Sequence, residues 1–207
     1  MPYSLDLKQI TVTDYELLLK NQNLLPGRRI LLEEIDSRFE AIRRAGINTA
    51  DRLKKELSTP QKLAAFADKS GIPEGYLVIL KRELGSLEQK PVPLSNFPDM
   101  DAALFVKLEE RGILNSKDYL ERAAGESAEL DALCDLVRIN GVGAVAARAF
   151  YEAGYRSAAD VAYAQAGTML ARVSAVNEQK KYYNAKLGVK DMQFCINFAV
   201  LLEKYSK

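Results

Sequence analysis

The sequence predicts an all-α fold. Apolar residues recur at three- and four-residue steps, as at Ile35, Phe39 and Ile42, and this spacing lines one face of a helix. Residues that start helices stand at short intervals, for example Thr59 directly before Pro60. No segment of the sequence alternates apolar and polar residues with the period of two that is typical of a half-buried strand.

The helices of the N-terminal half can be placed from their start and stop signals. Thr13 is expected to cap the first helix. A second helix is expected from Arg28 and should stop at Gly46, as helices do at a glycine just past their end. A third should begin at Pro60 and end at Gly71, where the next helix follows after a short turn.

The helical pattern is interrupted by turn-forming residues between Gly85 and Pro93. A chain of 207 residues is long enough for two small helical domains. We therefore predict one helical domain over residues 1–90 and a second over residues 91–207. The last helix of the second domain is expected to begin at Asp191, a fair N-cap residue.

The residue inventory argues against catalysis and metal binding. The chain has no histidine, which excludes Ser-His-Asp and Cys-His nucleophiles and His-ligated zinc. Its two cysteines, Cys134 and Cys195, lie far apart among apolar neighbours, and we expect both to be free and buried. We expect no catalytic residue, no metal site and no cofactor.

Neither a membrane nor the secretory route is indicated. The apolar runs are too short to span a bilayer. The first residues lack the basic start and apolar core of a secretory signal. We therefore expect a cytoplasmic protein without a membrane partner.

The charge is nearly balanced overall and uneven along the chain. The net charge is +1, so the whole molecule is no electrostatic trap for nucleic acid. Residues 91–135 contain 4 basic and 10 acidic residues, whereas residues 136–207 contain 10 basic and 5 acidic residues. The basic excess therefore falls in the last third of the chain.

A helix–glycine–helix corner occurs three times, in residues 39–49, 104–116 and 147–157. In each segment a helical run leads into a glycine, then an apolar residue, then Thr or Ser. The glycine is expected to end one helix and the apolar residue to enter the core. The hydroxyl residue, which is Thr49, Ser116 or Ser157, is expected to cap the next helix.

The third corner extends backwards into a second turn. Residues 136–150 contain the triplet Gly141, Val142 and Gly143, followed by small residues and then by Phe150. This segment resembles the helix-hairpin-helix motif, and its resemblance implies a SAM-like helical fold. Asn140 stands where that motif commonly has a proline, and asparagine also favours turns.

This turn is the candidate binding site. Glycines allow a positive φ and the close approach of another backbone. The amides of Gly143, Ala144 and Val145 are unpaired donors at a helix N-terminus, which attracts an anion. A guanidinium one turn into the helix would add charge towards a phosphate. The predicted nucleic-acid-binding residues are Gly141, Val142, Gly143, Ala144, Val145, Arg148 and Arg138.

The other two corners have acidic turns in the corresponding place. In residues 97–101, Asp99 and Asp101 align with the two glycines. Residues 33–36, Glu33-Glu34-Ile35-Asp36, are acidic as well and lack the turn glycines. Carboxylates at these positions would repel a phosphate, so we expect both turns to be structural and only the third to bind.

Most of the chain is also similar to a domain family of unknown function that is composed of tandem helix-hairpin-helix repeats. The similarity rests on Leu25-Pro26, Ala45-Gly46-Ile47, residues 91–94, residues 136–143 and residues 176–183. It implies tandem helix-hairpin-helix repeats and supplies no activity or site.

Two functions of different classes follow. In the first, the chain binds the backbone of DNA or RNA, with DNA favoured, through the hairpin and without reading base sequence. In the second, it is a protein–protein interaction or scaffold module whose hairpins serve packing alone. The acidic turns favour the second, and the intact hairpin in the basic third favours the first. The sequence leaves the oligomeric state open.

Overall fold

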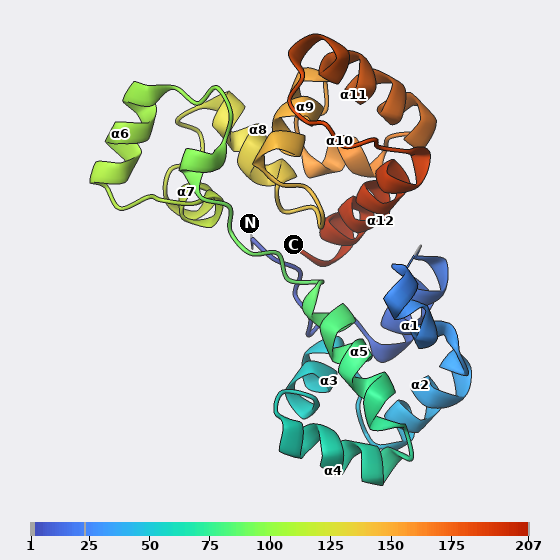
Figure 1. Ribbon diagram of the computed structural model, residues 1–207. Coiled ribbons are helices and arrows are strands. Elements are labelled where there is room, and N and C mark those ends of the chain that lie inside the picture. Colours follow the sequence, from blue (N-terminus) through green and yellow to red (C-terminus); the bar gives the residue numbers. More distant parts are fainter. Residues whose placement is uncertain (1–2, 23, 207) are drawn as a thin grey trace. The chain divides into compact units, whose positions relative to one another are not determined.

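The fold was analysed in a computed structural model that describes residues 3–22 and 24–206; Met1, Pro2, Asn23 and Lys207 lie outside the described residues. Within the described ranges the regular structure is helical, and β-type pairing is limited to isolated bridges. The predicted all-α class is therefore confirmed. The chain forms two compact units, one over Asp6–Glu88 and one over Gln89–Lys207 together with the residues before Asp6 (Figure 1).

The unit over Asp6–Glu88 is built from short helices around one core. Tyr15 and Phe39 are fully buried and their ring centroids lie 6.0 Å apart. Leu53 and Leu77 complete the interior from two further helices. The elements are α1 (Val12–Asn21), the 3-10 helix η1 (Pro26–Leu32), α2 (Ile35–Arg44), α3 (Ala50–Glu56), α4 (Pro60–Ser70) and α5 (Glu74–Gly85).

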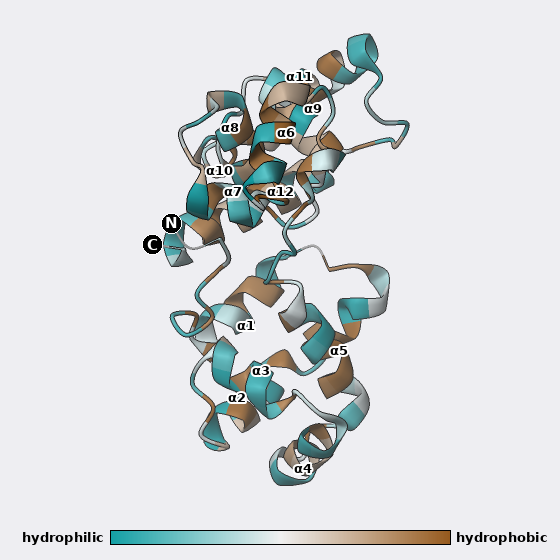
Figure 2. Cartoon of the chain, turned by 90° about the vertical axis from the view of Figure 1, so that its left-hand side faces the viewer, coloured by the Kyte–Doolittle hydropathy of each residue, from teal (hydrophilic) through white to brown (hydrophobic). Residues whose placement is uncertain are grey.

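The second unit packs its last helix against the two that precede it. Helix α12 lies along α10 and α11, and α8 packs on α7 and α9 (Figure 1). Buried apolar residues of the helices form the cores of the two units, and Figure 2 shows how hydrophobic and hydrophilic residues are distributed along the helices. The elements are the 3-10 helix η2 (Leu94–Asn96), α6 (Ala102–Glu110), α7 (Ser116–Arg122), α8 (Ala128–Leu136), α9 (Ala144–Glu152), α10 (Ala158–Ala162), α11 (Ala166–Lys180) and α12 (Val189–Tyr205).

The three predicted corners have the expected backbone. Gly46, Gly112 and Gly154 follow α2, α6 and α9 with φ values of +84°, +67° and +94°. In each corner the amide of the next, apolar residue donates to a carbonyl five residues earlier, at 3.0 to 3.3 Å. This bond satisfies a carbonyl that the helix end leaves unpaired.

One of the three predicted caps is wrong. Thr49 and Ser157 cap α3 and α10 as expected. Before α7, however, the side chain of Asn115 accepts the first-turn amides, and Ser116 lies inside the helix. Ser116 is fully buried, and its hydroxyl is bonded to the Tyr3 hydroxyl at 2.7 Å and accepts the amide of Val92 at 2.9 Å.

Three other helix starts also differ from the sequence-based expectation. Helix α1 is capped by Thr11, not by Thr13. The helix predicted from Arg28 is divided, because Glu34 takes a left-handed φ of 50° between η1 and α2. Helix α12 begins before Asp191, whose carboxylate reaches back to the amide of the N-cap residue.

In the unit over Asp6–Glu88, replacing either of two glycines by alanine should change the stability in opposite directions. Gly46 has a left-handed φ and Gly85 is the last residue of α5, and an added Cβ would meet no atom within 4 Å at either position. We expect Gly46→Ala to lower the free energy of unfolding by about 1–2 kcal/mol from backbone strain alone. Gly85→Ala should leave it unchanged or raise it by up to about 1 kcal/mol. Urea denaturation of both variants tests this, and equal effects would contradict the assigned conformations.

The two thiols should be unreactive in the folded protein. Cys134 and Cys195 are both buried and free. Burial raises the pKa of Cys195 to about 12, with Asp191 adding to the shift, and burial also raises the pKa of Cys134. Because the thiolate is the reactive form, neither thiol should react with a disulfide reagent at pH 8 until the chain unfolds. Rapid labelling of one cysteine without denaturant would show that its helix opens.

Candidate nucleic-acid interface

The third hairpin joins α8 to α9 through a tight, partly exposed turn. Gly141 takes a left-handed φ of +84°, and Gly143 is the N-cap residue of α9 with φ −87° and ψ 178°. Ile139 and Val142 are buried, and the amide of Val142 donates to the carbonyl of Ile139 at 3.0 Å. The turn is thus fixed from inside by its apolar residues, while both glycines face solvent.

The first-turn amides of α9 lack a side-chain acceptor. Gly143 makes no side-chain cap hydrogen bond, and a Cβ added to it would meet no atom within 4 Å. Val145, the second residue of α9, is 38% exposed. The structure therefore leaves these donors open, where the helix dipole favours negative charge.

The other glycine lies against the last helix. A Cβ built on Gly141 would lie 3.5 Å from Cε1 of Phe194, which belongs to α12. Phe194 is only half-buried. Its contact with the hairpin could not be read from the sequence, because nothing local relates α12 to a turn about 50 residues away.

Arg138, predicted to flank a phosphate, points into the unit. Its side chain is 3% exposed. Its Nε donates to the carbonyl of Tyr3 at 3.0 Å and its Nη2 to the hydroxyl of Ser206 at 2.8 Å, and Asp135 forms an ion pair with it. The guanidinium therefore ties residues near both ends of the chain to the end of α8.

Arg148, predicted to reach a phosphate, is also internal. Its side chain is 4% exposed. Its Nε and Nη2 both donate to the carbonyl of Pro98, at 3.0 and 2.7 Å, and Nη2 also pairs with Glu129 at 2.8 Å. This arginine fastens the turn of the second hairpin to α9, so we do not place it in the binding surface.

The second hairpin has the same backbone pattern and a different chemistry. Asp99 takes the left-handed conformation, with φ +55°, two residues before the N-cap of α6, as Gly141 does before α9. The N-cap is Asp101, whose Oδ1 accepts the amide of Leu104 at 2.8 Å. A carboxylate of the chain itself thus occupies the place of an anion, as the structural interpretation of this turn requires.

A tyrosine holds the same acidic turn. The hydroxyl of Tyr182 donates to Glu152 at 2.6 Å and lies 3.3 Å from Asp99. Burial and the hydrogen bond to Glu152 raise the pKa of Tyr182, so the hydroxyl remains a donor at neutral pH. In the first corner the acidic turn differs, since Glu34 is both left-handed and the N-cap of α2 and makes no side-chain cap.

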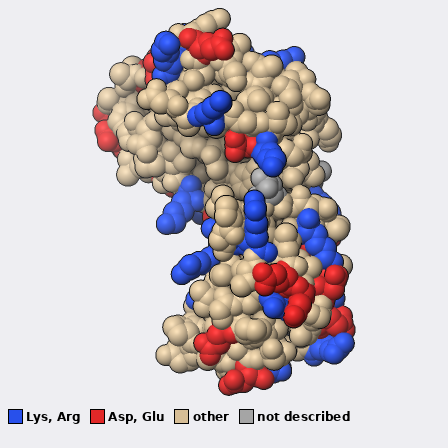
Figure 3. All heavy atoms as spheres, turned by 45° about the vertical axis from the view of Figure 1, so that its right-hand side comes forward, with Lys and Arg blue, Asp and Glu red and all other residues tan. Residues whose placement is uncertain are grey.

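Charged side chains are dispersed over the surface. Figure 3 shows one face on which Lys and Arg lie singly among uncharged residues, with acidic groups between them. Several cations of the basic third are engaged by aromatic rings: Arg156 lies 4.4 Å from the ring centroid of Tyr151, and Arg172 lies 5.9 Å from that of Tyr155. Part of the positive charge of residues 136–207 is therefore engaged within the protein.

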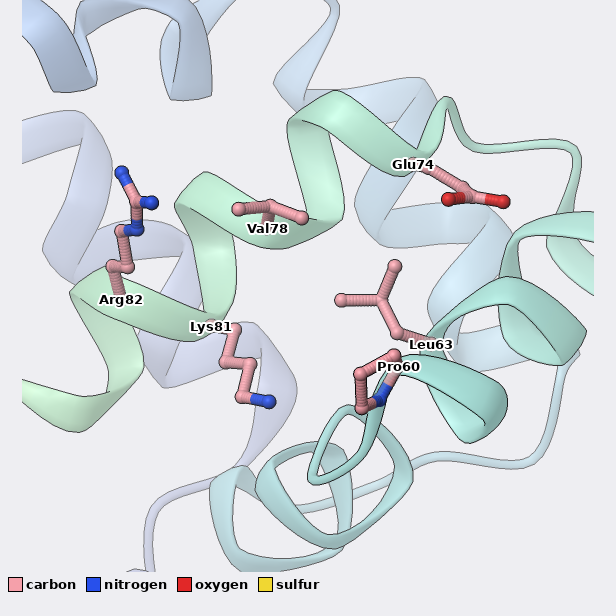
Figure 4. Close-up of a pocket in the computed structure, with 6 residues that line it drawn as sticks. All are labelled: Pro60, Leu63, Glu74, Val78, Lys81 and Arg82. Carbon is pink, nitrogen blue, oxygen red and sulfur yellow. The ribbon is translucent and has the colours of Figure 1, made fainter.

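A separate hollow lies in the unit over Asp6–Glu88, between α4 and α5, with a volume of about 450 Å³. Figure 4 shows Leu63 of α4 and Val78 of α5 as its apolar part, with Glu74 and Lys81 at different turns of α5. Lys81 donates to the carbonyl of Ser58 at 2.7 Å. Its lining brings together no nucleophile and acid–base pair, so it is not a candidate active site.

The described part of the chain offers neither a metal-binding cluster nor a helix that could span a membrane. Residues 3–22 and 24–206 contain no group of three or more Cys, Asp or Glu side chains arranged to hold a metal ion. Among the described helices, none has the length and apolar character needed to cross a bilayer.

Comparison with known proteins identifies the hairpin region. Residues 134–180 match a family model described as a SAM-like helix-hairpin-helix tandem. The match begins at the end of α8 and ends with α11, so it includes the turn at Gly141–Gly143 and leaves the acidic turns outside. No curated protein and no solved structure matches the chain. The chain thus contains a helix-hairpin-helix domain, and the wider resemblance to a tandem-repeat family of unknown function has no further support.

Proposed function

We propose that this chain binds the phosphate backbone of a nucleic acid, with DNA as the favoured partner, through the turn between α8 and α9. Gly141, Gly143 and Val145 are exposed at the binding surface, Ala144 contributes its backbone amide, and the buried Val142 fixes the turn from inside. Arg138 and Arg148 support that surface from inside and make no contact with the partner, since both are buried and bonded to protein groups.

The observation that carries this proposal is the open N-terminus of α9. In the related second hairpin the Asp101 carboxylate accepts a first-turn amide, whereas at Gly143 no side chain does so. Amides arranged at a helix N-terminus bind anionic oxygens by direct donation and through the helix dipole. The match of residues 134–180 to the helix-hairpin-helix family supports the same interpretation.

Binding through this surface would not depend on base sequence. The turn exposes glycine backbone and Val145, and none of residues 139–145 other than Asn140 has a polar side chain that could read a base edge. A single open hairpin contacts few phosphates. We therefore expect affinities in the range of non-specific binding, on the order of 10⁻⁴–10⁻⁶ M.

The test is a fluorescence-anisotropy titration of the protein against labelled single- and double-stranded oligonucleotides over a salt series. Binding to unrelated sequences with equal affinity, weakened by salt, is the expected result. Absence of binding at low salt would overturn the proposal and leave the alternative, a protein-interaction module in which the hairpins are structural.

A single substitution should separate binding from stability. Gly143→Asp places at the N-cap of α9 the residue that caps α6, and neither its φ of −87° nor its surroundings oppose a side chain. The new carboxylate should accept a first-turn amide and raise the stability by about 0.5 kcal/mol. It should also exclude phosphate, and weaken binding by about tenfold or more, because it removes charge-assisted hydrogen bonds and adds repulsion.

The matched control is Gly27→Asp in the other unit. Gly27 lies in η1, and an added Cβ there meets no atom within 4 Å, so the variant carries the same charge change in the other unit. It should bind as the original protein does. Equal binding losses in both variants would indicate a general charge effect, and unchanged binding of Gly143→Asp would remove the assigned surface.

A further inference from the structure

The hairpin contains no exposed cation of its own. Residues 139–147 have no Lys or Arg, and the next residue, Arg148, is buried. Backbone amides are neutral, so they orient a phosphate without displacing its counterions, and salt-dependent affinity comes from cationic side chains. A phosphate held at this turn therefore needs a cation supplied by a neighbouring element.

Helix α12 lies beside the turn. A Cβ added to Gly141 would lie 3.5 Å from Cε1 of the Phe194 ring. Lys190 stands four residues before Phe194 on the same helix, so the two side chains share one face with about 5–6 Å between their Cβ atoms. Lys190 is exposed, and within the described residues it forms no ion pair or hydrogen bond.

The acidic neighbour of Lys190 is occupied elsewhere. Asp191 follows it directly, but consecutive residues of a helix do not face each other. The carboxylate of Asp191 accepts the amide of Gly188 at 2.8 Å. Lys190 is therefore left to act on groups beside the hairpin.

Most other cations of the basic third already have partners in the protein. Arg138 and Arg148 are buried, and Lys180 lies 4.0 Å from Glu152. The remainder with identified partners are held by aromatic rings: Arg156 on Tyr151, Arg172 on Tyr155 and Lys204 on Tyr205. Lys181 and Lys186 belong to the connection before α12, and of the exposed lysines only Lys190 shares a helical face with the residue that contacts Gly141.

We infer that Lys190 supplies the positive charge that neutralises the phosphate held by the amides of Gly143, Ala144 and Val145. The inference rests on the proposed function and adds to it a residue that lies outside both the hairpin and the matched segment of residues 134–180. The interface then consists of two parts: α9 orients the phosphate through its amides, and α12 provides the charge.

The experiment measures the salt dependence of binding to one double-stranded oligonucleotide for the original protein and for Lys190→Ala. Loss of one phosphate contact should reduce the slope of log affinity against log salt by about 0.9. It should weaken binding several-fold at low salt and equally for unrelated sequences. Lys190→Arg, which keeps the charge, should retain the slope.

Two matched lysines control for a general effect of charge. Lys204→Ala removes a charge from the same helix, about 21 Å further along its axis, and should leave the slope unchanged. Lys186→Ala tests the connection just before α12 and should have a smaller effect than Lys190→Ala. An unchanged slope for Lys190→Ala, or equal losses in all three variants, would overturn the assignment of Lys190 while binding itself persists. Failure of the original protein to bind at all would instead overturn the proposed function, and this inference with it.

Discussion

The need to satisfy the ends of short helices is the constraint on which the rest of this structure depends. Only α11 and α12 exceed 12 residues among the helices of the described chain. Each helix leaves its first amides and last carbonyls without partners inside the helix, so a chain divided into many short helices has many such groups. Side chains of Thr, Ser, Asn, Asp and Gln accept the first-turn amides of most of them, and left-handed glycines end several. Helices α2, α5, α9 and α12 lack a side-chain cap, and of these only α9 begins at the glycine-rich turn of the third hairpin.

The glycines that end helices were the features that the sequence predicted best, because such an end depends on neighbouring residues. The left-handed glycines at Gly46, Gly112 and Gly154 were predicted from a glycine followed by an apolar residue, and all three are found. Errors stayed local: Asn115 caps α7 where Ser116 was expected, since Ser116 is needed by Tyr3 in the core. Glu34 takes a left-handed conformation and divides one predicted helix. This break could not be predicted, because the position is not occupied by a glycine.

The arginines were misplaced because their partners are distant in the sequence. Arg138 binds the carbonyl of Tyr3 and Arg148 that of Pro98, and neither pairing can be inferred from local pattern. A signal was nevertheless present for Arg148. Its helix is apolar or small on nearly all sides, which is typical of a buried helix, so a lone arginine there is better read as internal. Without these two arginines, the candidate binding surface consists mainly of backbone amides. The positive charge that a bound phosphate needs must therefore come from another part of the unit.

The two hairpins of the second unit show how one backbone can serve opposite purposes. Asp99 and Gly141 both take the left-handed conformation two residues before the N-cap of a helix, so aspartate and glycine both fit this turn. What differs is the N-cap. Asp101 satisfies the first turn of α6 internally, which stabilises that helix and excludes an anion. At Gly143 neither a positive φ nor a close neighbour requires glycine, and a capping side chain would make α9 more stable. The same side chain would occupy the donors, so in this hairpin the stability of the helix and the accessibility of its amides are competing properties of a single residue.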